Sequence, residues 1–230
     1  EILLAGLQRL EYRGYDSAGI AIQPREATSI DRRRTLGKVA ELLEEVKREP
    51  MSGCTGIAHT RWATHGAPSE RNALPHISND RICLVHNGII ENFESLRDEL
   101  KGTGREFTSE TDSEVIVHLV ESYYEESNDL LRAVKEAVQR LDGAYAIGVM
   151  CRDEPGRIVA ARLGSPLVVG VGIGEHYIAS DVLALRPVTD RFIYLEEGDL
   201  VDITADALSF WNVDDESVIR TSVRIQAGPD

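Results

Sequence analysis

The spacing of apolar residues changes near Gly143, and this change constrains the fold more than any other feature of the sequence. After Gly143, apolar residues recur at every second position in short runs that Gly, Pro, Asp and Glu separate, a pattern typical of strands. Strands are expected over residues 144–150, 157–162, 167–171, 177–180, 192–195, 200–203 and 208–211.

Before Gly143, helical spacing is interleaved with strand-like runs. Helices with one apolar face are expected over residues 1–12, 37–50, 91–100, 111–126 and 129–141. Strands are expected over residues 18–22, 28–35, 54–61 and 82–86. Interleaved helices and strands followed by a strand-rich half predict an α+β fold, in which helices cover antiparallel sheets.

The net charge of -14 argues against binding to nucleic acid or to anionic membranes, because phosphate contacts need clustered Lys and Arg. Three consecutive arginines at residues 32–34 form the one basic run. They are interpreted as part of an edge or solvent-facing strand, with a nucleic-acid patch as the alternative. The sequence has no membrane-length apolar run and no signal-peptide pattern, so a cytoplasmic location is expected.

The three cysteines, Cys54, Cys83 and Cys151, are odd in number and far apart in apolar, strand-like segments. This favours buried, reduced thiols over a disulfide framework or a zinc site. The first helix has no Ser, Thr, Asp or Asn to cap its free amides, and Glu1 is not an initiator Met. We therefore expect that the native protein continues upstream of residue 1.

Residues 59–66, His-Thr-Arg-Trp-Ala-Thr-His-Gly, place a polar cluster where a strand opens into a loop, a usual place for binding residues. The Arg61 guanidinium can clamp a carboxylate through two hydrogen bonds, or it can form a structural ion pair. Thr64 and His65 can hydrogen-bond the same ligand or only their own loop. Trp62 can cover that ligand or be a partly buried aromatic. Their proximity to one another favours a binding site.

Asn87 and Gly88 offer a side-chain amide and an unobstructed backbone amide in a connection between a strand and a helix. Such a pair can stabilise a developing oxyanion, or it can be an ordinary Asn-Gly turn.

Asp112 stands at the start of an expected helix, so a capping box is the first explanation for it. The box pairs Ser109 with Asp112 or Thr111 with Glu114, and Asp112 would then only satisfy backbone amides. In the alternative, the Asp112 carboxylate faces a pocket and pairs with a ligand ammonium.

Two other motifs are interpreted as structural. Cys83, His86 and Asn87 contain the residue types of a thiol protease triad, but on a strand positions 83 and 86 point to opposite faces. The Gly-Val-Gly-Ile-Gly run at residues 170–174 precedes a strand rather than a helix, which favours a turn over a nucleotide-binding loop.

Several segments together resemble one family: Leu-Glu-Tyr-Arg-Gly-Tyr-Asp-Ser-Ala-Gly at residues 10–19, the cluster at residues 59–66, His-Asn-Gly-Ile-Ile-Glu-Asn at residues 86–92, and Ser-Glu-Thr-Asp at residues 109–112. The chain is similar to the glutaminase domain of the glucosamine-6-phosphate synthase family. The similarity continues through residues 161–167 and 178–181, so residues 1–230 are expected to form one glutaminase domain.

The resemblance implies the fold of N-terminal-nucleophile (Ntn) hydrolases, an αββα sandwich of two antiparallel sheets between helical layers. It implies these roles: Arg61 binds the α-carboxylate of glutamine, Asp112 holds the α-ammonium, Thr64 and His65 add hydrogen bonds, and Asn87 with the Gly88 amide forms the oxyanion hole. The loop from Arg61 to about Ser69 would close over glutamine, with Trp62 near the exit of ammonia.

The resemblance also implies a reaction, the hydrolysis of L-glutamine to glutamate and ammonia without cofactor or metal. An N-terminal Cys attacks the side-chain amide, its own α-amine acts as the base, and a γ-glutamyl thioester forms. A sugar-phosphate isomerase domain of the same polypeptide, in a homodimeric enzyme, then uses the ammonia to convert fructose 6-phosphate to glucosamine 6-phosphate.

The sequence departs from that family pattern, because it contains neither the N-terminal Cys nor the isomerase domain. We expect an excised domain that is inactive alone. The alternatives are a glutamine-binding module without a nucleophile and another class II amidotransferase, such as the phosphoribosyl-pyrophosphate type. Leu74 stands where the family usually carries His, and little functional effect is expected from it.

Overall fold

The computed structural model describes residues 1–26 and 28–226. Its α-helices are α1 (Ile2–Leu10), α2 (Val39–Arg48), α3 (Phe93–Gly102), α4 (Ser113–Ser127) and α5 (Leu130–Val138). Its strands are β1 (Ser17–Gln23), β2 (Asp31–Leu36), β3 (Thr55–Arg61), β4 (His76–Ser78), β5 (Ile82–Asn87), β6 (Tyr145–Cys151), β7 (Ile158–Leu163), β8 (Val168–Val171), β9 (His176–Ala179), β10 (Arg191–Tyr194), β11 (Leu200–Ile203), β12 (Leu208–Trp211), β13 (Ser217–Val218) and β14 (Val223–Arg224).

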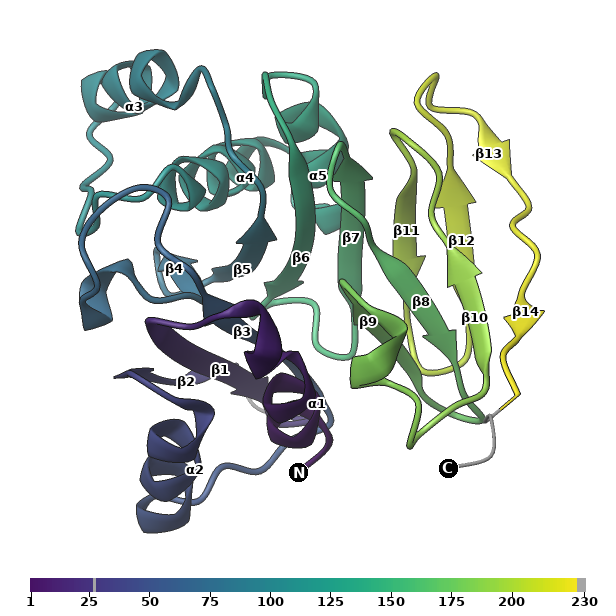
Figure 1. Ribbon diagram of the computed structural model, residues 1–230. Coiled ribbons are helices and arrows are strands. Elements are labelled where there is room, and N and C mark those ends of the chain that lie inside the picture. Colours follow the sequence, from purple (N-terminus) through teal and green to yellow (C-terminus); the bar gives the residue numbers. More distant parts are fainter. Residues whose placement is uncertain (27, 227–230) are drawn as a thin grey trace.

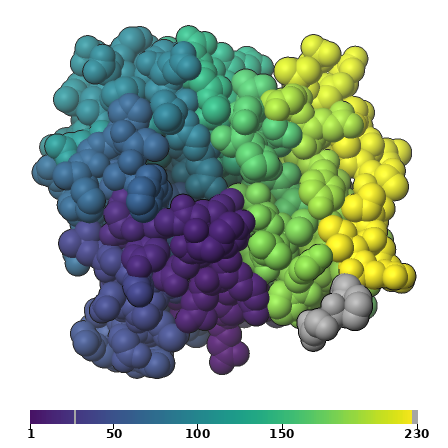
Figure 2. Space-filling view, in the orientation of Figure 1, coloured from purple at the N-terminus to yellow at the C-terminus, as the bar shows by residue number. Residues whose placement is uncertain are grey.

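The strands form three antiparallel sheets. The largest has seven strands in the order β13-β12-β11-β7-β6-β5-β4. The other two have the orders β2-β1-β3 and β14-β10-β8-β9, so β3 and β9 each end a sheet. Figure 1 shows α4 and α5 against the large sheet, and α1 and α2 beside the sheet formed by β1, β2 and β3. Figure 2 shows the N-terminal segment in purple packed against the green segment that contains β9.

Strand β6 shows how the alternating pattern produces these layers. Its Ile147 and Val149 belong to the apolar cluster that also includes α4 and α5, whereas Ala146 and Met150 belong to clusters formed with the two smaller sheets. Successive side chains of a strand point to opposite faces, so one strand contributes to two cores. The arrangement is four layers, with helices outside and sheets inside.

Most of the expected helices and strands are present with bounds shifted by a few residues, but three short strands were missed. Strand β4 lies between the strands expected over residues 54–61 and 82–86, and β13 and β14 follow the last strand that was expected. Each has two or three residues, too few for alternation to be recognised. None of the helices in the described part of the chain has the length and apolar character needed to cross a membrane.

The cysteine prediction was wrong for Cys54, which is exposed just before β3. Cys83 and Cys151 are buried, and all three thiols are free. Burial raises the pKa of Cys83 to about 12, so this thiol is a poor nucleophile. Cys83 lies in the core between the sheets, while His86 contacts Ser113 of α4, and the two therefore do point to opposite faces.

The three arginines lie on β2, which is an edge strand as expected, but two of them do not face solvent. Arg32 donates to the carbonyl of Pro75 at 3.2 Å, and Arg34 donates to the carbonyl of Ala73 at 3.0 Å. Arg33 pairs with Asp31 and Glu49. The basic run therefore holds the segment before β4 in place.

Candidate active site

One cavity of about 250 Å³ brings together all six residues that the sequence singled out for a site. They are Arg61, Thr64, His65, Asn87, Gly88 and Asp112. The cavity lies where β3 and β5 end and α4 begins. Its position agrees with the expectation that the polar residues follow strands.

Arg61 is almost completely buried, with 6% of its side chain exposed, and its guanidinium lies against the loop that follows it. It donates to the carbonyls of His65 and Gly66, the latter at 3.0 Å. Its Nη1 is 3.4 Å from Asp16 Oδ1, so Arg61 does form a structural ion pair. A role for Arg61 in binding a ligand carboxylate stays a prediction.

Asp112 does not cap α4, although it occupies the N-cap position, so the capping explanation is wrong for this residue. Its Oδ2 instead accepts a hydrogen bond from the backbone N–H of Ile90 at 2.8 Å. Its Oδ1 lies 3.9 Å from His65 Nδ1. Since Asp112 is only 3% exposed and lines the pocket, the pocket contains a buried carboxylate.

Glu114 satisfies the amides that precede α4. Its carboxylate accepts from the N–H of Thr108 at 2.8 Å and of Ser109 at 2.7 Å, and its own N–H donates to Thr111 Oγ1 at 3.3 Å. The capping box of Thr111 with Glu114 is therefore half formed. The Glu114 N–H does bond to Thr111 Oγ1, but the Glu114 carboxylate accepts from residues that precede Thr111. Asp112 is left available to the pocket.

Gly88 can only be glycine. Its φ is +123°, and a Cβ on it would lie 2.2 Å from the carbonyl oxygen of Ala144. The neighbouring Asn87 ends β5, and its Oδ1 lies 2.9 Å from His59 Nε2 on β3. This pair is thus held between two sheets rather than in a free turn.

The rim of the pocket carries Trp62, which is 68% exposed. Its indole ring lies over Gly14, where a Cβ would be 2.5 Å from Trp62 Cε3. His65 packs edge-on against Phe93 with ring centroids 4.9 Å apart, and its Nδ1 has no hydrogen-bond partner among the described residues. Trp62 therefore lies against the rim with most of its surface open.

Sequence reasoning missed Arg13 and Ser180, which also line the pocket. Arg13 Nη2 donates to Ser180 Oγ at 2.7 Å, so the segment after α1 is tied to the end of β9. The two residues are far apart in the sequence. The only sequence signal for them was that each lies in a segment that resembles the family, residues 10–19 and 178–181. Leu74 also lines the pocket and is buried.

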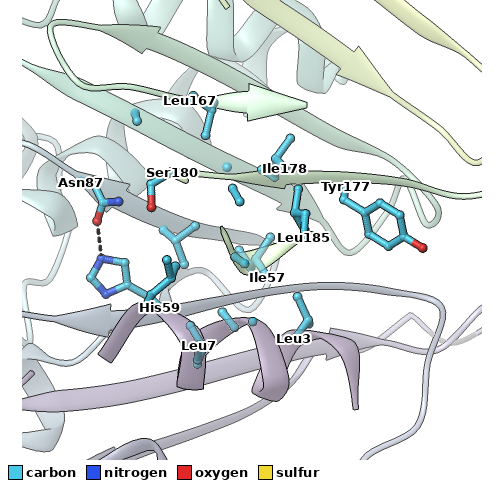
Figure 3. A pocket seen from close by; sticks show the side chains of 18 of the residues that line it. Leu3, Leu7, Ile57, His59, Asn87, Leu167, Tyr177, Ile178, Ser180 and Leu185 are labelled. Atoms are coloured by element: carbon cyan, nitrogen blue, oxygen red, sulfur yellow. Dashed lines mark hydrogen bonds between the residues drawn. The ribbon is translucent and has the colours of Figure 1, made fainter. Parts of the chain in front are cut away.

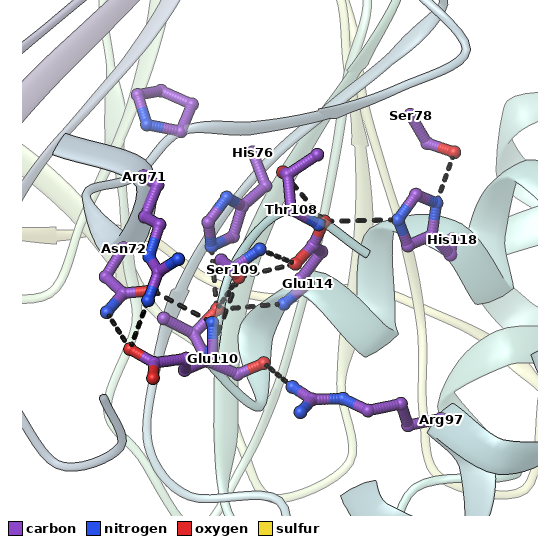
Figure 4. Close-up of polar contacts among 12 residues, drawn as sticks. Arg71, Asn72, His76, Ser78, Arg97, Thr108, Ser109, Glu110, Glu114 and His118 are labelled. Atoms are coloured by element: carbon purple, nitrogen blue, oxygen red, sulfur yellow. Dashed lines mark hydrogen bonds and ion pairs between the residues drawn. The ribbon is translucent and has the colours of Figure 1, made fainter. Parts of the chain in front are cut away.

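A buried polar network lies behind the pocket (Figure 4). His118 links Ser78, with Nδ1 2.7 Å from Ser78 Oγ, to Glu114, with Nε2 3.4 Å from Oε1. Although this is a Ser-His-carboxylate series, Ser78 is only 1% exposed and cannot meet a substrate. His76 Nε2 lies 2.8 Å from Thr111 Oγ1. The network supports the segment that carries Asp112.

The stability of the folded protein at acid pH is expected to depend on this network. Burial alone raises the pKa of Glu114, but hydrogen bonds from His118, Ser109 and two backbone amides outweigh burial and lower the pKa from 4.5 to about 2. The folded pKa is below the unfolded one, so the contribution of Glu114 is present above about pH 4.5 and is lost as pH falls towards 2. Glu114→Gln should show a smaller loss of stability across this window in urea titrations.

Glu126→Gln is the matched control, because Glu126 is an exposed residue of the same helix. This variant should keep the acid dependence of the parent. An unchanged acid dependence in Glu114→Gln would contradict the role given to the Glu114 carboxylate.

A second cavity, an apolar groove of about 170 Å³, runs into the pocket. Figure 3 shows Leu3 and Leu7 of α1 on one side of the groove and Ile178 and Leu185 on the other. The groove lies between β3 and β9, and it shares Arg13, His59, Thr60, His86, Asn87 and Ser180 with the pocket. An open apolar channel therefore leads to the polar site.

The chain belongs to the glutamine amidotransferase domain family, whose sequence model matches residues 59–187, more than half of its length. Curated relatives include the glutamine–fructose-6-phosphate aminotransferases (isomerizing) of Pseudomonas syringae pv. tomato and Yersinia pseudotuberculosis, which are 56% and 52% identical over 100% of this chain. The chain spans 37% of the length of these relatives. The family resemblance found in the sequence is confirmed.

Two solved structures share the fold. Glutamine phosphoribosylpyrophosphate amidotransferase from B. subtilis superimposes with a TM-score of 0.77 at 26% identity, over 92% of this chain and 46% of that one. A second structure, described as the allosteric regulatory enzyme of purine biosynthesis, gives 0.74 at 26% identity over 97% and 46%. The expected αββα fold of Ntn amidotransferases is confirmed.

Proposed function

We propose that this chain binds L-glutamine and supports hydrolysis of its side-chain amide to glutamate and ammonia. The observation that carries the proposal is the convergence of six sequence-selected residues on one pocket that contains both a guanidinium and a buried carboxylate. An α-amino acid presents a carboxylate and an ammonium, and these two charges suit Arg61 and Asp112. Asn87 and Gly88 then serve the developing oxyanion.

To bind the ligand carboxylate, Arg61 would have to share or give up hydrogen bonds that its guanidinium makes in this structure. Its guanidinium hydrogen-bonds the carbonyls of the loop after Trp62, so a ligand carboxylate would share or replace these partners. Thr64 and His65 lie on this loop and line the pocket. Closure of the loop over glutamine is thus proposed to be centred on Arg61.

None of Cys54, Cys83 and Cys151 lines the pocket, so the cysteine nucleophile that the resemblance implies is not among the lining residues. The resemblance assigns it to an N-terminal Cys, and the groove offers a place for the strand that would carry it. Both β3 and β9 have an open edge along the groove, and an added strand could pair with their backbones. The polar end of the groove would direct its thiol to Asn87.

The function of the longer protein is part of the proposal. The relatives at 52–56% identity are named for amination of fructose 6-phosphate, so we assign the ammonia from this domain to the synthesis of glucosamine 6-phosphate. A fused sugar-phosphate isomerase domain, a homodimer and a cytoplasmic location are proposed with it. The phosphoribosyl-pyrophosphate type remains the second candidate, because its fold is shared.

The test uses the full-length protein and measures glutamate release from L-glutamine, with and without fructose 6-phosphate. Glutamate release coupled to glucosamine 6-phosphate is expected, and L-asparagine should not replace glutamine. Bound glutamine without glutamate release would identify a non-catalytic module. Amination of phosphoribosyl pyrophosphate instead of the hexose phosphate would support the second candidate.

A further inference from the structure

His59 and Asn87 meet across the space between two sheets. His59 lies on β3 of the three-stranded sheet, and Asn87 ends β5 of the seven-stranded sheet. Their contact joins His59 Nε2 to Asn87 Oδ1 at 2.9 Å, and Figure 3 shows it at the polar end of the groove. His59 is not one of the six residues to which the proposed function assigns a role.

The direction of this hydrogen bond follows from the groups involved. The amide oxygen of Asn87 can only accept, so Nε2 of His59 must carry the proton and donate it. Burial lowers the pKa of His59 to about 4, so the ring is neutral near pH 7 and has a single N–H. His59 Nδ1 has no hydrogen-bond partner among the described residues. The ring is therefore the Nε2–H tautomer.

An Nε2–H donor in turn favours the amide orientation that has Oδ1 at the ring, and the other end of the Asn87 amide is then left to face the pocket. With Oδ1 bound to His59, the Nδ2 group is directed away from the ring, and no described residue accepts a hydrogen bond from it. In the opposite orientation of the amide, Oδ1 would be turned towards the developing oxyanion and would repel it. The amide oxygen and the oxyanion are both acceptors, so no hydrogen bond can form between them.

We infer that His59 is a positioning residue that keeps the Asn87 amide turned with its N–H group towards the oxyanion. The inference rests on the proposed glutaminase function. His59 lines the pocket, and its role is exerted through Asn87. Neighbouring His86 cannot substitute for it, because its ring contacts Ser113 Oγ at 2.8 Å and the carbonyl of Ala144 at 3.3 Å.

The test is a double-mutant cycle on glutamate release by the full-length protein, with His59→Phe, Asn87→Ala and the double variant. Loss of one oxyanion donor lowers kcat by about 100- to 1,000-fold, and this is expected for Asn87→Ala. His59→Phe should lower kcat by roughly 10- to 100-fold with KM changed by less than about threefold, since only the transition state uses the amide. The double variant should match Asn87→Ala.

Multiplying effects in the double variant, or a parental kcat in His59→Phe, would overturn the inference while leaving the glutaminase function in place. A parental kcat in Asn87→Ala would instead overturn the oxyanion role on which both depend. The tautomer is a second readout that needs no substitution. In the full-length protein labelled with 15N-imidazole histidine, His59 should be protonated at Nε2 near pH 7, and protonation at Nδ1 alone would refute the inference.

Discussion

Arg61→Ala is expected to weaken glutamine binding to the full-length protein by about 2 to 5 kcal/mol, because it leaves the ligand carboxylate buried without its partner. The structure adds a second source of loss. The same guanidinium hydrogen-bonds the carbonyls of His65 and Gly66, so its removal also releases the loop. Binding can be measured by calorimetry in a background that cannot turn over, with the nucleophilic Cys replaced by Ala.

Arg61→Lys is the matched control, because it keeps the positive charge but loses the fork that serves several acceptors at once. We expect Arg61→Lys to bind glutamine more weakly than the parent and more tightly than Arg61→Ala. If Arg61→Ala binds glutamine as the parent does, Arg61 is only the structural partner of Asp16.

Asp112→Asn is expected to cost a similar amount, roughly 2 to 5 kcal/mol, because the ligand ammonium would lose its buried counter-charge. The substitution conserves shape, and the amide oxygen can still accept the hydrogen bond from Ile90 N–H. Its effect should therefore come from charge. The affinity for glutamine can be measured in the same inactive background. The affinity for an analogue that lacks the α-amino group can be measured there by competition with glutamine.

The analogue provides the internal control. It should bind the parent weakly and should lose little further affinity in Asp112→Asn, since it has no ammonium to pair. An equal loss of affinity for glutamine and for the analogue would show that Asp112 acts through the fold rather than through the ligand charge.

The sequence predicted which residues gather in one pocket because they lie in three short segments, two at strand ends and one at the start of a helix. Asn87 and Gly88 were recognisable as a turn that does not open a hairpin, and Gly88 does require a positive φ. For Asp112, local sequence favoured the wrong explanation. Whether Asp112 or Glu114 caps a helix depends on how the preceding segment, Thr108 to Thr111, folds back. The spacing of the residues does not contain this information.

Contacts between segments that are distant in the sequence could also not be predicted from the sequence patterns. His59 was noticed only as the first residue of a cluster, and its partner Asn87 is 28 residues away on another sheet. Arg13 and Ser180 are separated by 167 residues. The spacing of apolar residues predicts which face of a strand is buried. It does not predict which strand of another layer packs against that face. These pairs needed the assembled fold.

The open edges of β3 and β9 also have a consequence for how the protein behaves at high concentration. Each edge presents unpaired backbone groups beside an apolar groove, and such an edge is a template for strands of other molecules. A strand seated between them would remove both templates at once. Occupation of the groove would thus protect the protein from aggregation as well as complete the site.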